Sequence, residues 1–107
     1  TKADVESAAS ALELAKEEGE TGDPVELRAK VEADPKDHQA RLDLSVALFA
    51  RGDAEAAIDE LLELVRRDKA WNDEAARKQL VKVFDTLGGA HELTVSGRRR
   101  LSSVLFS

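Results

Sequence analysis

The segment that decides the fold is DHQARLDLSVALFARGDAEAAIDELLELVRRDKAWNDEAARKQLVKVFDTL, residues 37–87. Its centre is the turn Arg51-Gly52-Asp53, which lies between two runs rich in apolar residues at helical spacing. A third such run begins near Leu80 and ends at Leu87. Helical runs that are joined by a short glycine turn and then by a longer break are typical of stacked helical hairpins. The segment therefore predicts an all-α chain built from antiparallel helix pairs.

Aspartate and asparagine side chains stand where the helices of this chain are expected to begin. Their oxygens accept hydrogen bonds from the free N–H groups of a first helical turn, so we expect caps at Asp23, Asp37, Asp53 and Asn72. Gly52 supplies the left-handed backbone conformation that commonly ends a helix. The six helices predicted from these boundaries span residues 4–18, 24–34, 38–50, 54–67, about 73–87 and about 92–105.

The spacing of the helix starts indicates an internal repeat. Asp4, Asp37 and Asn72 are 33 and 35 residues apart, and a period near 34 residues with two helices per unit is the tetratricopeptide spacing. Arg41 and Ser45 depart from this pattern, because an aromatic and a smaller residue are expected there. We therefore predict one tetratricopeptide-like domain over residues 1–107, with a clear repeat at 37–70 and degenerate units at 4–35 and 72–106. Residues that fit the repeat are Pro35, Gly52, Ala57 and Leu61.

The net charge of −6 is unevenly distributed. Residues 1–63 carry 17 acidic and 7 basic residues, whereas residues 64–107 carry 5 and 9. A polarised surface steers a charged partner toward one end of a molecule, although a solvated surface with no such role is the alternative interpretation. Oppositely charged pairs four residues apart, which stabilise exposed helix faces, are Glu63–Arg67, Asp73–Arg77 and Glu74–Lys78.

The composition excludes several kinds of site. The chain has no Cys, so disulfides and thiolate metal sites are absent, and no apolar run is long enough to span a membrane. His38 and His91 lack nearby carboxylates at metal-ligand spacing, so both are expected at the surface. No nucleophile turn or phosphate-binding glycine loop is present. The sequence therefore predicts a protein that is not an enzyme and holds no cofactor or metal.

Two features near the C-terminus are candidate partner-binding elements. Trp71 is either a packing anchor between two helices, seated on Ala76, or an exposed hot spot for a partner. The run Arg98–Arg100 either faces solvent and nearby acids, binds a protein, or contacts nucleic-acid phosphates. The acidic chain has only four aromatic residues and none interleaves this run, so nucleic acid is not an expected partner.

The end segment, residues 101–107, is apolar enough to be either docked in the core or free to bind a partner. We expect it to be docked, because the fifth helix needs a cover on its second side. The full set of candidate partner-binding residues is Trp71, Arg98, Arg99, Arg100, Leu101, Leu105 and Phe106.

Two segments carry a more specific resemblance, LELVRRDKAWNDEAARKQL at residues 62–80 and GRRRLSSVLFS at residues 97–107. Together with residues 34–41 and 51–53, they resemble the C-terminal tetratricopeptide-like region of bacterial thioredoxin-like co-chaperones, the chaperedoxin family. The resemblance implies a cytoplasmic module that binds unfolded clients and a chaperonin, with docking assigned to residues 98–106. It also implies a thioredoxin-like domain upstream of Thr1, so we expect this chain to be a fragment. Self-association of a helical-repeat protein is the alternative function, with a possible homo-oligomer.

Overall fold

The structure is a computed structural model that describes residues 23–106. The predicted helix over residues 4–18 lies outside the described residues. Within the described part the chain forms helices and no strands, in an order that confirms the predicted all-α, tetratricopeptide-like class. The helices are α3 (Pro24–Ala33), α4 (His38–Ala50), α5 (Ala54–Asp68), α6 (Trp71–Leu87) and α7 (Glu92–Phe106).

Three of the predicted caps are present at the starts of α3, α4 and α5. The carboxylate of Asp23 accepts a hydrogen bond from the N–H of Val25 at 2.9 Å. Asp37 accepts one from Ala40 at 3.0 Å. Asp53 accepts one from the third helical residue of α5 at 3.2 Å. Each bond satisfies an N–H group that has no partner within its helix, so these aspartates define where the helices begin.

Two clusters of apolar side chains hold the helices together. The smaller cluster joins α3 to α4, and the larger joins α5, α6 and α7. Helix α4 contributes to both, because Leu44 is buried in the first while Leu42 and Phe49 pack against the second. The apolar side chains of α4 are therefore covered from two sides. Buried members of the smaller cluster are Leu27, Val31, Ala40, Leu44 and Ala47; those of the larger are Ile58, Leu61, Leu62, Leu64, Val65, Ala76, Leu80, Val83 and Phe84.

The junction between α5 and α6 differs from the prediction. Asn72 was predicted to cap α6, but the helix begins at Trp71, its N-cap position is Ala70, and no side chain caps it. Asn72, Asp73 and Glu74 have φ of 49°, 56° and 60°, so three successive residues form a left-handed turn. Such a turn costs about 1–2 kcal/mol per residue other than glycine and less for Asn and Asp, so Glu74 is the residue at which local propensity opposes it most.

The left-handed turn also changes the ion pairs of α6. The predicted four-residue pairs are wrong, because Glu74 pairs with Arg77 at 2.8 Å and Asp73 pairs with Lys78 at 2.7 Å. The right-handed geometry that places residues four apart on one face does not hold at residues 72–74. Glu63 does pair with Arg67 at 2.6 Å, as predicted, since α5 is regular there.

Helix α7 folds back after Gly88, which has φ of 99° and ends α6. Gly97 is buried in the middle of α7, where glycine ordinarily lowers helix stability. A Cβ atom at this position would lie 2.6 Å from Cε1 and 2.8 Å from Cζ of Phe84, and 3.6 Å from Cγ2 of Ile58. Glycine therefore lets α7 approach α5 and α6 closely.

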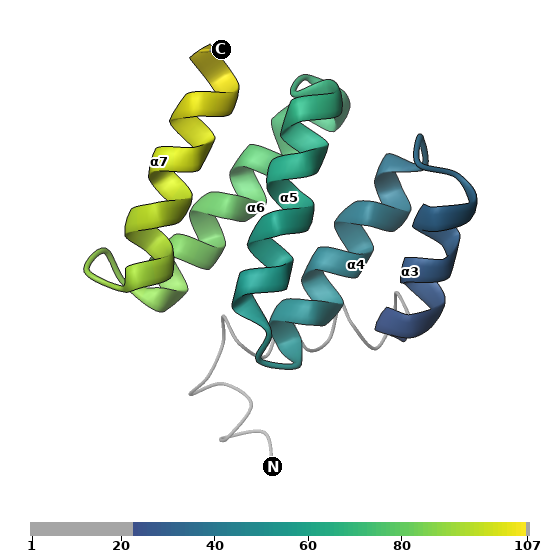
Figure 1. Cartoon of the computed structure of the whole chain (residues 1–107), viewed down its shortest axis with the longest axis horizontal. Coiled ribbons are helices and arrows are strands. Elements are labelled where there is room, and N and C mark those ends of the chain that lie inside the picture. The colour runs from purple at the N-terminus through teal and green to yellow at the C-terminus, as the bar shows by residue number, and fades with distance from the viewer. Residues whose placement is uncertain (1–22, 107) are drawn as a thin grey trace.

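The helices lie side by side in a row (Figure 1). Helix α3 is at one end, α7 is at the other, and α5 packs against α4, α6 and α7 in between. Because α3 and α7 are the outermost helices, each has an outer side that no other described helix covers.

Candidate protein-interaction surface

Helix α7 has a buried side and an exposed side that follow from its sequence period. Thr94 and Gly97 are buried, and Leu101, Val104 and Leu105 are half-buried against the larger cluster. The opposite side carries Val95, Arg99, Ser102 and Phe106, which are spaced by four, three and four residues and are all exposed. We call these four residues the α7 outer face. Val95 is 47% exposed and Phe106 is 84% exposed.

The end segment is docked in part. Leu101 and Leu105 pack against the larger cluster, as expected for a cover. That cover lies on α5 as well as on α6, whereas the sequence predicted it for the fifth helix, α6, alone. Phe106 is excluded from the core, because it falls on the side of α7 that faces away from both helices. Phe106 and Val95 are thus the two large apolar side chains of α7 that are exposed.

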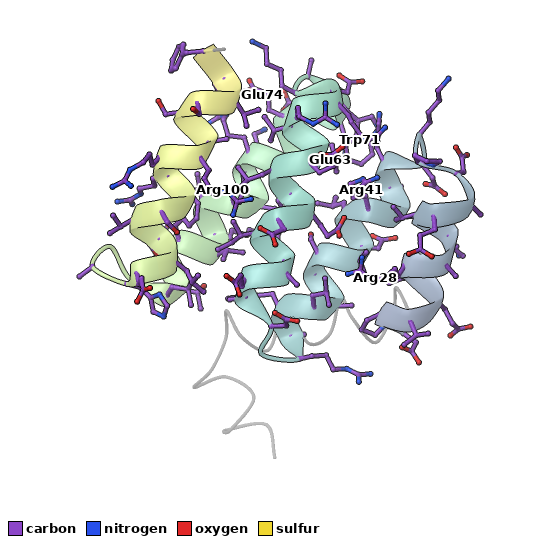
Figure 2. All side chains as sticks on the ribbon, viewed as in Figure 1. Arg28, Arg41, Glu63, Trp71, Glu74 and Arg100 are labelled. Atoms are coloured by element: carbon purple, nitrogen blue, oxygen red, sulfur yellow. The ribbon has the colours of Figure 1, made fainter. Side chains whose placement is uncertain are left out.

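The three arginines do not form one basic patch, because successive residues on a helix point in directions about 100° apart. The Arg98 guanidinium lies 6.0 Å from the centre of the Phe84 ring, in cation–π contact. Arg100 pairs with Asp59 of α5 at 2.8 Å (Figure 2). Arg99 is exposed and has no ion pair among the described residues. Arg99 is therefore the cation of this run that remains available to a partner.

Of the two interpretations of Trp71, its position fits the first, a packing anchor between helices. Its ring meets the His38 ring edge-on, with centroids 5.8 Å apart and planes at 69°, and it packs against the larger cluster. His38 was predicted at the surface, but this contact half-buries it and leaves its Nδ1 buried without a hydrogen-bond partner. His91 is exposed, as predicted, and its Nδ1 accepts a hydrogen bond from the N–H of Leu93 at 3.0 Å.

An ion-pair network that the sequence did not reveal joins three helices. Glu60 of α5 accepts hydrogen bonds from Arg41 of α4 at 2.8 Å and from Arg28 of α3 at 3.2 Å. Arg28 and Arg41 are labelled in Figure 2. The Arg41 side chain is 8% exposed, and that of Glu60 is 14% exposed. Arg41 occupies the position where the repeat usually has an aromatic residue, so an ion pair fills the space between helices. The partners are 19 and 32 residues apart, so no sequence spacing marks them.

Three carboxyl groups have shifted pKa values, and the hydrogen bond from Lys78 lowers the pKa of Asp73 at the start of α6. Burial raises the pKa of Asp43 on α4, and the hydrogen bond from the side-chain amide of Gln39 at 2.8 Å opposes that rise. Hydrogen bonds from Arg66 and Arg67 lower the pKa of Glu63 on α5. The three carboxyl groups lie on helix faces, where burial and ion pairing with neighbouring side chains account for the shifts.

Within residues 23–106, no group of three or more His, Cys, Asp or Glu side chains is arranged to hold a metal ion. None of the described helices is long and apolar enough to cross a membrane.

A row of antiparallel helices in which each packs mainly on its neighbours defines a helical-repeat protein, a class whose exposed helix faces bind other proteins. A family model described as Tetratricopeptide repeat matches residues 17–106. The chain belongs to the tetratricopeptide repeat family, whose domains are generally interaction modules without catalytic activity. No curated protein and no solved structure matches the chain at the threshold applied in those two searches.

Proposed function

We propose that this chain is the partner-binding module of a thioredoxin-like co-chaperone, and that it binds a chaperonin and unfolded polypeptides through the α7 outer face. Membership of the tetratricopeptide repeat family supports a protein partner. The resemblance of residues 62–80 and 97–107 to the chaperedoxin family supports a chaperonin and unfolded polypeptides as the partners. The same resemblance is the basis for proposing a cytoplasmic, bacterial protein with a thioredoxin-like domain upstream of these residues.

The observation that carries the proposal is the position of Phe106. Phe106 is 84% exposed at the end of α7, on the same side of the helix as Val95 and as Arg99, which has no ion pair among the described residues. An aromatic side chain beside an arginine is the composition that interface hot spots favour. Apolar contact with Phe106 supplies affinity, and a carboxylate of the partner opposite Arg99 supplies orientation.

The division into repeats belongs to the same proposal. Residues 37–70 correspond to the α4–α5 hairpin, and residues 72–106 correspond to the α6–α7 hairpin. The unit at residues 4–35 lies mostly outside the described residues, which include only its second helix, α3. The second helix of this last unit is α7, so the α7 outer face lies at the end of the stack.

Point substitutions test the proposal better than truncation after Gly97. Truncation would remove Leu101 and Leu105 from the core as well as the exposed residues, so a loss of binding would have two explanations. Phe106→Ser and Arg99→Glu change only exposed side chains. Val25→Ser is the matched control, because Val25 is 76% exposed at the opposite end of the row, on α3.

The measurement is binding of the immobilised full chain to purified bacterial chaperonin by biolayer interferometry. We expect each of the two α7 substitutions to weaken binding about tenfold or more, a loss of at least ~1.4 kcal/mol, while the control binds like the original chain. A parallel assay follows suppression of aggregation of a denatured polypeptide by light scattering. Unchanged chaperonin binding in both α7 variants, or no binding by the original chain, would refute the proposal.

Self-association is the second candidate function. Helix α4 is apolar on two sides, but α3 and α5 cover both of them within one chain. What favours self-association is the exposure of a large apolar residue at each end of the row, Val25 on α3 and Phe106 on α7. Sedimentation across a concentration series separates this candidate from a strictly monomeric binding module.

A further inference from the structure

The outer side of α3 matches the α7 outer face in composition. Leu27 and Val31 point into the smaller cluster, which leaves Val25, Ala29 and Glu32 on the opposite side of the helix. All three are exposed, Val25 at 76%, and Glu32 has no ion pair among the described residues. We call these three residues the α3 outer face. It carries an apolar residue, a small residue and an unpaired anion.

The two faces also match in spacing. Val25 and Glu32 are seven residues apart on α3, and Arg99 and Phe106 are seven residues apart on α7. Seven residues of helix rise about 10.5 Å in both cases. When the two helices run antiparallel, Val25 lies opposite Phe106, Ala29 lies opposite Ser102, and Glu32 lies opposite Arg99. An apolar contact and an ion pair then form together, with small side chains between them that let the helices approach.

The α3 outer face and the α7 outer face do not pair within one chain, because α3 and α7 lie at opposite ends of the row (Figure 1). The charges along the chain favour the same pairing between chains. Residues 23–50, which include α3 and α4, carry six acidic and four basic residues, whereas residues 71–106, which include α6 and α7, carry four acidic and six basic residues. The α3 end of one copy therefore attracts the α7 end of another.

We propose that two copies of this chain associate head to tail, with the α3 outer face of one copy antiparallel on the α7 outer face of the next. The inference rests on the exposed α7 face invoked in the proposed function, and it adds a second partner for that face. The ion pair between Glu32 and Arg99 sets the register, and contact between Val25 and Phe106 buries the two most exposed apolar side chains of the described chain.

Such an interface predicts a particular mode of assembly. The two faces differ, so the contact is heterologous, and a second copy leaves one α3 face and one α7 face free for further copies. One helix on one helix is a small interface, so we expect weak association, with dissociation constants on the order of 0.1–1 mM. The average mass should therefore rise steadily with concentration and should not level off at a dimer.

The test is sedimentation equilibrium of the full chain with two single charge reversals, Arg99→Glu and Glu32→Arg. Each variant alone places like charges opposite each other, so we expect its association to be weakened about five- to tenfold. An equimolar mixture of the two variants again offers opposite charges at both possible contacts, and association should return to the original level. Glu26→Arg, on a different side of α3, is the control for the change in net charge and should associate like the original chain or slightly more strongly.

A strictly monomeric original chain, a mass that levels off at the dimer, or a mixture that fails to recover association would each overturn the inference. The outcome is separable from the proposed function, because Glu32→Arg lies outside the α7 outer face and should leave chaperonin binding unchanged. A monomeric chain that binds chaperonin would overturn only head-to-tail association. A chain that self-associates and does not bind chaperonin would overturn only the proposed function.

Discussion

Replacing Glu74 tests the left-handed turn at the start of α6, which is the feature of this fold that contradicts local propensity most directly. Glu74 has φ of 60° and ψ of 38°, and its side chain is half-exposed and pairs only with Arg77. We compare Glu74→Gly with Glu74→Ala. Both variants lose the ion pair with Arg77, so the difference between them reports the backbone conformation alone.

The magnitude follows from two opposing effects. Glycine adopts the left-handed conformation freely, which relieves about 1–2 kcal/mol of steric cost at this residue. Glycine also has more freedom to lose on folding than alanine, which offsets about 0.5–1 kcal/mol of that gain. We therefore expect Glu74→Gly to be more stable than Glu74→Ala by about 0.5–1 kcal/mol. In a right-handed helix the order is reversed, with glycine about 1 kcal/mol less stable than alanine.

The measurement is urea unfolding, followed by circular dichroism and by the fluorescence of Trp71, which is the only tryptophan and lies three residues before the substitution. Lys82→Gly and Lys82→Ala provide the control pair, because Lys82 is exposed in the regular part of α6. There we expect glycine to be less stable than alanine by about 1 kcal/mol. If Glu74→Gly is also less stable than Glu74→Ala, residue 74 is right-handed and the reasoning about the turn is refuted.

Three further substitutions address the core, the buried ion pair and the shifted pKa. Gly97→Ala should lower the free energy of unfolding by about 1–2 kcal/mol, because the added Cβ would overlap the Phe84 ring. Gly89→Ala is the control for thermal unfolding and should be nearly neutral, because its Cβ would meet only an arginine nitrogen at 4.0 Å. Arg41→Ala should lower the free energy of unfolding by about 2–3 kcal/mol in urea, because it leaves the largely buried Glu60 carboxylate without its closer partner. A loss below about 0.5 kcal/mol would contradict this reasoning. Asp43→Asn should raise stability at pH 7 by about 0.5 kcal/mol, because burial raises the pKa of Asp43 and the folded state therefore binds its proton more tightly than the unfolded state. That gain should be complete above the raised pKa and should vanish below the ordinary value of 3.8; an equal gain at pH 3 and pH 7 would exclude titration as its cause.

Local chemistry accounts for most of the helix boundaries. The caps at Asp23, Asp37 and Asp53 involve N–H groups only two or three residues away, so the sequence alone identifies them. The end of α6 at Gly88 was predicted for the same reason, because glycine favours the backbone angles found there. The exception is Asn72, where a good capping residue adopts a left-handed conformation instead. Packing of Trp71 against His38 accompanies that exception, and it depends on a helix that begins 33 residues earlier.

The candidate surface was predictable only in part. The sequence identified residues 98–106 as an unusual basic and apolar end, but it did not separate the residues that bind the core from those that face outward. Arg98 and Arg100 have partners on α6 and α5, whereas Arg99 has none among the described residues. That distinction arises because each successive side chain on a helix points about 100° away from the last.

The amino-acid sequence by itself determined the helical class, the repeat length and most helix ends, because these depend on side chains that interact within about four residues of one another. The tertiary structure alone decided that Glu60 joins Arg28 and Arg41, that Asp73 and Glu74 exchange their expected partners, and that Phe106 is left outside the core. The Glu60 network and the side of α7 that meets the core depend on how one helix packs on another, whereas the pairs of Asp73 and Glu74 depend on the left-handed turn at residues 72–74.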